Sequence, residues 1–193
     1  QAFSQLSQPT QSFSSISSTS VASPMPFSTR NPAMEKESAA SGIFGRVRFV
    51  LVETSHPGNV GSVARAIKTM GFGDAPGSLV LVSPREPAVL THPDAIAMAS
   101  GADDVLARAH IVDSIEPALA GAALTVAMTA RQREFGPPRL LPRDAATQAR
   151  TLLDGPAAPG VAFVFGNERY GLPNDVVVRC SAVTHIPANP AYA

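Results

Sequence analysis

The amino-acid sequence predicts an α/β protein with a parallel sheet and helices on both faces. From about residue 45, short apolar runs rich in β-branched residues alternate with alanine-rich stretches of helical periodicity. Continuous apolar runs are typical of strands buried on both faces, and helices between them supply the crossovers that parallel pairing requires. We expect strands at Val47–Val52, Leu79–Val82, Leu124–Met128, Val161–Phe165 and Val183–Ile186, with a weaker strand near Ile111. We expect helices at Val60–Met70, Asp94–Ser100, Ile115–Ala120, Arg143–Leu153 and Asn174–Arg179.

The first predicted helix has the clearest pattern. Asn59 is placed to cap its N-terminus, and Gly71 is placed to end it in a left-handed conformation. Arg65 and Lys68 fall on the opposite side from its apolar residues. Helical spacing predicts that these apolar residues face the sheet: Val60, Val63, Ala64, Ile67 and Met70.

The chain divides by composition into a tail and one domain. Residues 1–42 are rich in Ser, Gln, Thr and Pro and poor in aliphatic residues. Such a segment buries too little apolar surface to offset its ordering entropy, so we expect a disordered tail. Residues 43–193 are long enough for a single domain with a sizeable core.

Composition excludes several classes of function. The chain contains no apolar run near the roughly 20 residues of a membrane span. Its only cysteine is Cys180, and its four histidines lack metal-ligand spacing, so neither a disulfide nor a metal site is expected. The formal net charge is zero, which gives no general sign of nucleic-acid binding. A local cluster, formed by Arg131, Arg133, Arg139, Arg143 and Arg150, is either a solvated surface or an RNA contact.

Two strand–loop–helix segments carry the candidate chemistry. In His56–Gly61 (HPGNVG), glycines permit a tight turn before a helix N-terminus that favours an anion, although such turns are also common structural elements. In Phe165–Pro173 (FGNERYGLP), Glu168 lies between two glycines directly after an apolar strand. Glu168 is either a solvated loop acid or a partner of ligand groups. A third segment, Ile186–Ala193 (IPANPAYA), is an extended turn whose backbone would be available to an adenine or simply exposed.

Together, LVETSHPGNVGSVARAIKTMGF, FVFGNERYGLPND and IPANPAYA resemble the three motifs of the SPOUT-class (SpoU-like) RNA 2′-O-methyltransferases. The resemblance covers about residues 46–192 and is strongest to the tRNA (cytidine/uridine-32) ribose methyltransferases. It implies a trefoil-knotted α/β fold, a homodimer, a cytoplasmic location, S-adenosyl-L-methionine as methyl donor and a tRNA substrate. No metal or membrane is implied.

The resemblance also assigns residues to roles. It implies that Asn59, Arg65 and Glu168 form the catalytic set. It implies cofactor contacts by Met128, Thr129, Ala130, Gly166, Ile186, Pro187 and Asn189. Arg131 and Arg133, which follow the cofactor loop, are expected to face RNA phosphates.

The third motif normally continues into a helix that completes the cofactor pocket, the knot and part of the dimer interface. Because the sequence ends at Ala193, we expect that this helix is missing from the chain. Three alternatives to a tRNA enzyme stay open: a ribosomal RNA methyltransferase, a non-catalytic RNA-binding subunit of the same fold, and an unrelated nucleotide-binding domain. Absence of GxGxxG after the first strand disfavours a dehydrogenase.

Overall fold

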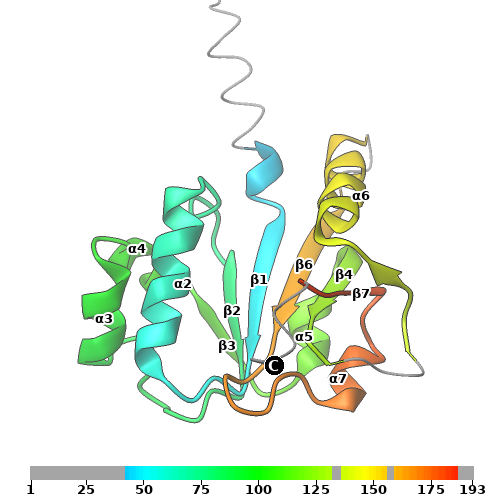
Figure 1. Cartoon of the computed structure of the whole chain (residues 1–193). Coiled ribbons are helices and arrows are strands. Elements are labelled where there is room, and N and C mark those ends of the chain that lie inside the picture. The colour runs from blue at the N-terminus through cyan, green and yellow to red at the C-terminus, as the bar shows by residue number, and fades with distance from the viewer. Residues whose placement is uncertain (1–41, 132–135, 156–158, 187–193) are drawn as a thin grey trace, which may run out of the picture. The chain divides into compact units, whose positions relative to one another are not determined.

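The computed structural model describes residues 42–131, 136–155 and 159–186. Within these residues, seven parallel strands form one sheet in the order β3-β2-β1-β6-β4-β7-β5 (Figure 1). The strands are β1 (Val47–Val52), β2 (Leu79–Val82), β3 (His110–Val112), β4 (Ala122–Met128), β5 (Arg139–Leu140), β6 (Gly160–Phe165) and β7 (Ala182–Thr184). The predicted α/β class with a parallel sheet is confirmed.

Helices lie between the strands along the chain. They are α2 (Pro57–Thr69), α3 (Pro93–Ala99), α4 (Asp103–Ala107), α5 (Ile115–Leu119), α6 (Pro142–Asp154) and α7 (Asn174–Val177). Each predicted helix and strand is present, with ends that differ by a few residues. The sequence interpretation missed α4 and β5, which have only five and two residues.

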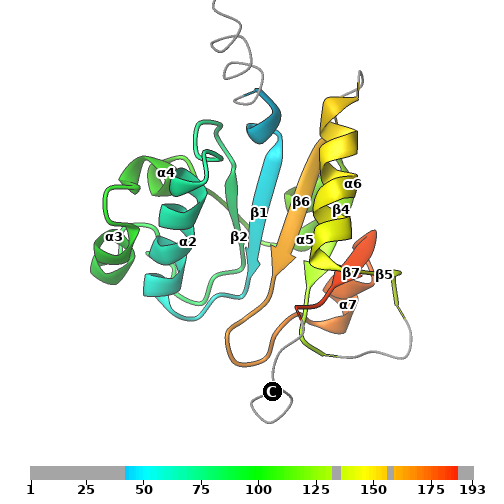
Figure 2. The ribbon, with the colours of Figure 1, turned by 45° about the horizontal axis from the view of Figure 1, so that its top comes forward.

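Both faces of the sheet are covered, as the alternation along β1 shows. Val50 and Val52 belong to a core that also contains residues of α5 and α7. Leu51 packs with α2 to α4, and Val47 packs with α6. Because successive side chains of a strand point to opposite faces, α2 and α6 share one face and α5 and α7 cover the other (Figure 2).

The start of α2 differs from the prediction. His56 is the N-cap, and its Nδ1 accepts a hydrogen bond from Gly58 N–H at 3.1 Å. Pro57 suits the first helical position, so the helix begins two residues before Asn59. The prediction that Asn59 caps the helix is therefore wrong, and its side chain instead points to Glu168.

The end of α2 is as predicted at Gly71, which has a φ of +80°. The N–H groups of Gly71 and Phe72 donate to the carbonyls of Lys68 and Ile67, at 3.1 Å and 2.9 Å, in a Schellman arrangement. Met70 does not face the sheet core as predicted, and is 66% exposed. Met70 follows the last helical residue, where the chain already turns away.

The rest of α2 is oriented as its pattern predicts. Val60, Ala64 and Ile67 are buried and Val63 is half-buried. Arg65 and Lys68 are exposed on the other side, where Lys68 Nζ pairs with Asp104 of α4 at 2.7 Å.

The sheet brings four carboxyl-terminal strand ends to the same level. Leu51 of β1 and Met128 of β4 both align with Phe165 of β6, and Met128 also aligns with Thr184 of β7. The chain leaves β1 toward β2, while β6 is the other neighbour of β1. Loops diverge at such a switch point, which is where open α/β sheets bind ligands.

None of the described helices is long and apolar enough to cross a membrane. In the same part of the chain, no group of three or more His, Cys, Asp or Glu side chains is arranged to hold a metal ion.

Candidate active site at the carboxyl edge of the sheet

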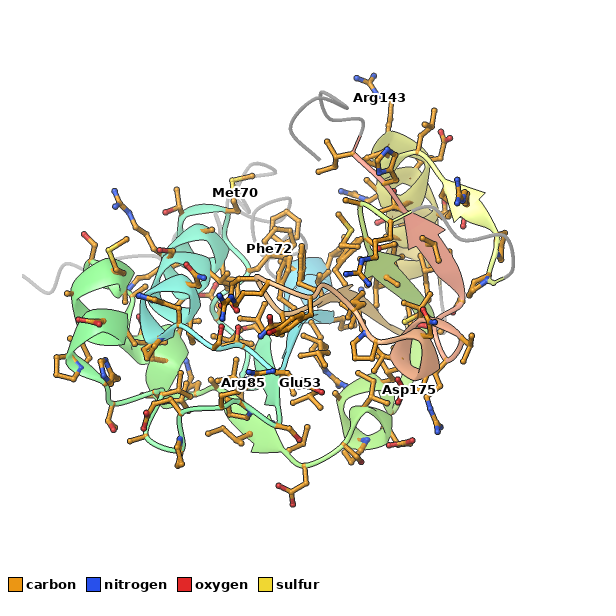
Figure 3. The ribbon with its side chains drawn as sticks, turned by 60° about the horizontal axis from the view of Figure 1, so that its bottom comes forward. Glu53, Met70, Phe72, Arg85, Arg143 and Asp175 are labelled. Atoms are coloured by element: carbon orange, nitrogen blue, oxygen red, sulfur yellow. The ribbon has the colours of Figure 1, made fainter. Side chains whose placement is uncertain are left out.

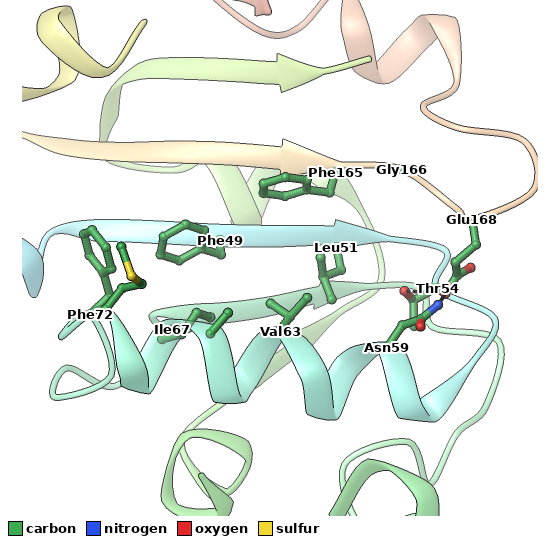
Figure 4. Close-up of a pocket in the computed structure, with 12 residues that line it drawn as sticks. Phe49, Leu51, Thr54, Asn59, Val63, Ile67, Phe72, Phe165, Gly166 and Glu168 are labelled. Atoms are coloured by element: carbon green, nitrogen blue, oxygen red, sulfur yellow. Dashed lines mark hydrogen bonds between the residues drawn. The ribbon is translucent and has the colours of Figure 1, made fainter. Parts of the chain in front are cut away.

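The Glu168 carboxylate connects the loop after β6 to the loop after β1 (Figure 4). Its Oε2 accepts hydrogen bonds from the Ser55 N–H at 3.1 Å and the Ser55 hydroxyl at 2.8 Å. Its Oε1 accepts one from Asn59 Nδ2 at 2.9 Å, with longer contacts of 3.4 Å from the Thr54 hydroxyl and the His56 N–H. The first two motifs therefore meet directly through their polar side chains.

These contacts determine the charge of Glu168. Burial is the largest single influence and raises its pKa. Hydrogen bonds from Asn59, from its own backbone N–H and from Ser55 together outweigh burial, and lower the pKa from 4.5 to about 2. At neutral pH the group is a carboxylate surrounded by donors, and a carboxylate with so low a pKa is a weak general base. Its geometry suits it to orient the groups that donate to it.

Asn167 fixes the loop that carries Glu168. Its side chain is buried, accepts hydrogen bonds from the N–H groups of Arg169 at 2.8 Å and Tyr170 at 3.2 Å, and donates to the Glu53 carbonyl at 2.6 Å. Asn167 and Gly171 also exchange backbone hydrogen bonds of 3.1 Å and 2.8 Å. The loop is thus tied both to itself and to the end of β1.

Gly166 allows this loop to close. A methyl group built on Gly166 would overlap the backbone of Gly171 and Leu172. Backbone atoms at these two residues cannot move aside as the end of a flexible side chain could, so only glycine fits at this position.

Arg65 is not part of the Glu168 cluster. It lies six residues after Asn59 on α2, roughly 240° around the helix axis. Its side chain is exposed, and among the described residues it has no hydrogen-bond or ion-pair partner. The structure therefore brings Asn59 and Glu168 together, and leaves Arg65 facing solvent, where an anion can reach it.

The residues predicted to bind the cofactor lie at or after the carboxyl ends of β4, β6 and β7, which are neighbours in the sheet, and Met128 is the last residue of β4. Thr129 N–H donates to the Thr184 carbonyl at 3.1 Å, so the segments after β4 and β7 are in contact. Ala130 is exposed, as is Ile186, whose apolar side chain is 63% accessible. Beside it, His185 Nδ1 is buried without a partner among the described residues.

Three of the predicted site residues lie outside the described residues: Pro187, Asn189 and Arg133. Arg131 is exposed, and its N–H donates to the Thr129 hydroxyl at 3.2 Å. Within the arginine cluster noted in the sequence, Arg150 pairs with Asp154 at 2.6 Å on α6. That arginine is accounted for by an ordinary helix-surface ion pair.

An apolar groove of about 530 Å³ leads away from the Glu168 cluster between α2 and the sheet (Figure 4). Glu168, Asn59 and Thr54 are at one end, and Phe72 is at the other. The remaining lining residues are Phe49, Leu51, Val63, Ala66, Ile67, Met70, Phe165 and Gly166.

Sequence reasoning missed Thr54, Ser55 and Asn167. Asn167 carried a usable signal, because asparagine beside glycine often holds a turn through its side chain. Thr54 and Ser55 carried none, since their role depends on a carboxylate more than 100 residues away.

Comparison with known proteins supports these motifs. The model of the SpoU rRNA Methylase family matches residues 46–193. A tRNA (cytidine/uridine/adenosine-2′-O-)-methyltransferase TrmJ from Pseudomonas aeruginosa is 46% identical over 148 residues, which are 76% of this chain and 54% of that protein. The tRNA (cytidine/uridine-2′-O-)-methyltransferase TrmJ of Klebsiella pneumoniae is 48% identical over 149 residues, 76% of this chain and 56% of that protein. The chain thus spans about half the length of these curated relatives.

Solved structures agree with the sequence matches. A probable methyltransferase from Bordetella pertussis is 53% identical, with a TM-score of 0.72 over 79% of this chain and 87% of that one. TrmJ from Z. mobilis is 33% identical, with a TM-score of 0.65 over 75% of this chain and 60% of that one. The motifs, the sheet and these matches together show that the chain belongs to the SpoU rRNA Methylase family.

Proposed function

We propose that the protein containing this chain transfers a methyl group from S-adenosyl-L-methionine to a ribose 2′-hydroxyl of tRNA. The observation that carries the proposal is the 2.9 Å hydrogen bond from Asn59 to Glu168, which joins two motifs of a methylase family at one sheet edge. Curated relatives named as tRNA 2′-O-methyltransferases, at 46–48% identity, favour tRNA as the substrate. Position 32 of the anticodon loop rests on the motif resemblance alone.

In the proposed reaction, the protein positions two reactants and excludes water. When bound, S-adenosyl-L-methionine supplies a methyl group that its sulfonium already activates. Asn59, held by Glu168, lies beside the acceptor ribose. Arg65 holds a neighbouring phosphate and stabilises the developing alkoxide as the hydroxyl proton is lost to solvent, because a guanidinium stays protonated and does not serve as a base.

The residues present fit the proposed cofactor. Met128 ends β4, Thr129 and Ala130 follow it, Gly166 follows β6, and Ile186 follows β7, so their backbones converge on one edge. Exposed Ile186 offers an apolar surface for a purine, and beside it the buried Nδ1 of His185 has no hydrogen-bond partner among the described residues. Pro187 and Asn189 complete the proposed set.

We further propose the trefoil knot, the homodimer and the cytoplasmic location that the resemblance implies, with Arg131 and Arg133 facing RNA phosphates. The groove along Phe49, Phe72 and Phe165 favours the packing of a further helix against it. These aromatic side chains are half-buried, and removing their remaining apolar surface from water would be stabilising. We assign this place to the helix that follows the third motif in the family, shared with the dimer partner.

Ribosomal RNA is the second candidate substrate, and the family's own description as rRNA methylases favours it. The motifs define the reaction better than they define the RNA. A non-catalytic RNA-binding role is disfavoured, because Asn59, Arg65 and Glu168 are all present.

Calorimetric titration tests the cofactor assignment, with S-adenosyl-L-methionine in one experiment and NAD in a matched control. We expect heat of binding with the methyl donor and none with NAD, because the loop after β1 lacks the dinucleotide-binding glycines. Binding of NAD alone would contradict the proposal. So would binding of neither ligand by both this chain and the full-length protein.

A further inference from the structure

Tyr170 and Arg85 form an exposed pair beside the Glu168 cluster. Tyr170 is 56% exposed although it belongs to the tightly bonded loop after β6. The Arg85 guanidinium, from the loop after β2, lies over its ring at 5.7 Å from the centroid. Glu53 Oε2 lies 3.8 Å from the same guanidinium, and Figure 3 shows Glu53 and Arg85 together at this edge. Loops after three neighbouring strands thus present one aromatic ring and one planar cation.

The backbone beneath this pair is fixed. Tyr170 N–H donates to the buried Asn167 side chain, which also holds the Glu53 carbonyl. Arg85 N–H donates to the Thr54 carbonyl at 3.0 Å. These bonds use the main-chain groups of Tyr170 and Arg85, so the loop conformation does not depend on the side chains of these two residues. The exposed ring therefore has no evident role in packing.

The chemistry of the pair favours stacking over phosphate binding. Glu53 already compensates the charge of Arg85, which weakens its attraction for a phosphate. An exposed aromatic ring and a guanidinium plane are the surfaces on which proteins stack unpaired RNA bases. Tyr170 is two residues from Glu168, so a base on this platform would adjoin the nucleotide held at Asn59.

We propose that Tyr170 and Arg85 form a stacking platform for the nucleobase adjacent to the methylated nucleotide, and so position the RNA strand. This inference rests on the proposed function. The platform acts on RNA binding and not on the methyl donor, which separates it from the cofactor loops.

The test uses the full-length protein with Tyr170→Ala, Tyr170→Phe, Arg85→Ala and Arg85→Lys, and measures the Kd for tRNA and for S-adenosyl-L-methionine. We expect Tyr170→Ala to weaken tRNA binding about 5- to 100-fold, the range for loss of one base–aromatic stack. Tyr170→Phe keeps the ring and should stay within about twofold of the parent. Arg85→Lys keeps the charge but loses the plane, and should also weaken tRNA binding. The Kd for the methyl donor should not change in any variant.

A spectroscopic readout reports stacking directly. This chain contains no tryptophan, so the emission that Tyr170→Trp adds to that of the parent protein comes from the platform. Its emission should be quenched when tRNA is added. Arg179→Ala is the matched control, because Arg179 is also exposed and paired with a carboxylate, Glu116 at 2.7 Å, outside the platform.

An unchanged Kd for tRNA in Tyr170→Ala, with the parent protein binding and methylating tRNA, would overturn the platform alone. Weaker binding in Arg85→Ala with a flatter salt dependence, but not in Tyr170→Ala, would also overturn it and identify a phosphate contact. If the parent protein neither binds nor methylates RNA, the proposed function and the platform fall together.

Discussion

Replacing Arg65 with alanine should reduce methyl transfer by about 10²- to 10³-fold, the usual cost of removing a group that stabilises a developing oxyanion. Arg65 is exposed and unpaired among the described residues, so the substitution should change the free energy of unfolding by less than about 0.5 kcal/mol. Single-turnover transfer with saturating tRNA measures the loss, and calorimetry measures the affinity for the methyl donor, which should not change.

Two further variants show whether the loss of methyl transfer in Arg65→Ala is specific to this guanidinium. Arg65→Lys keeps a positive charge but cannot bond a phosphate through a bidentate fork, so its activity should fall between the parent and Arg65→Ala. Lys68→Ala removes a cation one turn further along α2 that is already paired with Asp104, and should retain full transfer. Equal loss of methyl transfer and of cofactor affinity in Arg65→Ala would contradict the assignment of Arg65 to the RNA side of the reaction.

Replacing Glu168 with glutamine should detach the loop after β6 from the loop after β1. The carboxylate presents two acceptors, to Asn59 on Oε1 and to Ser55 on Oε2. A glutamine amide has only one acceptor oxygen, and its NH₂ would face a donor on the other side. We expect transfer to fall about 10- to 100-fold because Asn59 loses its orientation, a cost comparable to losing supporting contacts of a site. The free energy of unfolding should fall by only about 1 kcal/mol, since the Glu168 side chain is only partly buried and solvent weakens its contacts.

The pH dependence of the unfolding free energy tests whether the charge of Glu168 is the cause of the stability that Glu168→Gln loses. The folded-state pKa of Glu168 is about 2, below the ordinary 4.5, so its contribution is fully present above pH 4.5 and is lost as the pH falls toward 2. The difference in unfolding free energy between the parent and Glu168→Gln should therefore shrink over that window. Glu86→Gln, in the loop after β2, serves as the control carboxylate. A difference that stays constant from pH 6 down to pH 2.5 would show that Glu168 does not carry this charge-dependent contact.

Periodicity predicted the elements that carry the site, because each is long enough to show a pattern. The apolar runs of β1, β4 and β6 and the helical spacing of α2 are visible over four or more residues. The two-residue strand β5 shows no such pattern. It is held partly by the Thr184 hydroxyl, which donates to the Leu140 carbonyl at 2.8 Å across more than 40 residues. Short elements of this kind depend on tertiary contacts that local sequence does not encode.

The sequence predicted residues of the site but not the contacts between them. Motif resemblance named Asn59 and Glu168 separately, and only the fold shows that they touch each other. Local reasoning placed Asn59 as a helix cap, since it could not anticipate that His56 would cap the helix and leave the amide free for a distant carboxylate. The same limit explains why Ser55 was missed.

Methyl transfer to tRNA tests the central claim most directly. Full-length protein, S-adenosyl-L-methionine labelled in its methyl group, and an anticodon-loop tRNA transcript should give labelled RNA that resists alkaline cleavage at one ribose. A matched transcript with a 2′-deoxy nucleotide at position 32 should take up no label. Label on a base, label retained in the 2′-deoxy transcript, or uptake only by ribosomal RNA would contradict tRNA ribose methylation at this position.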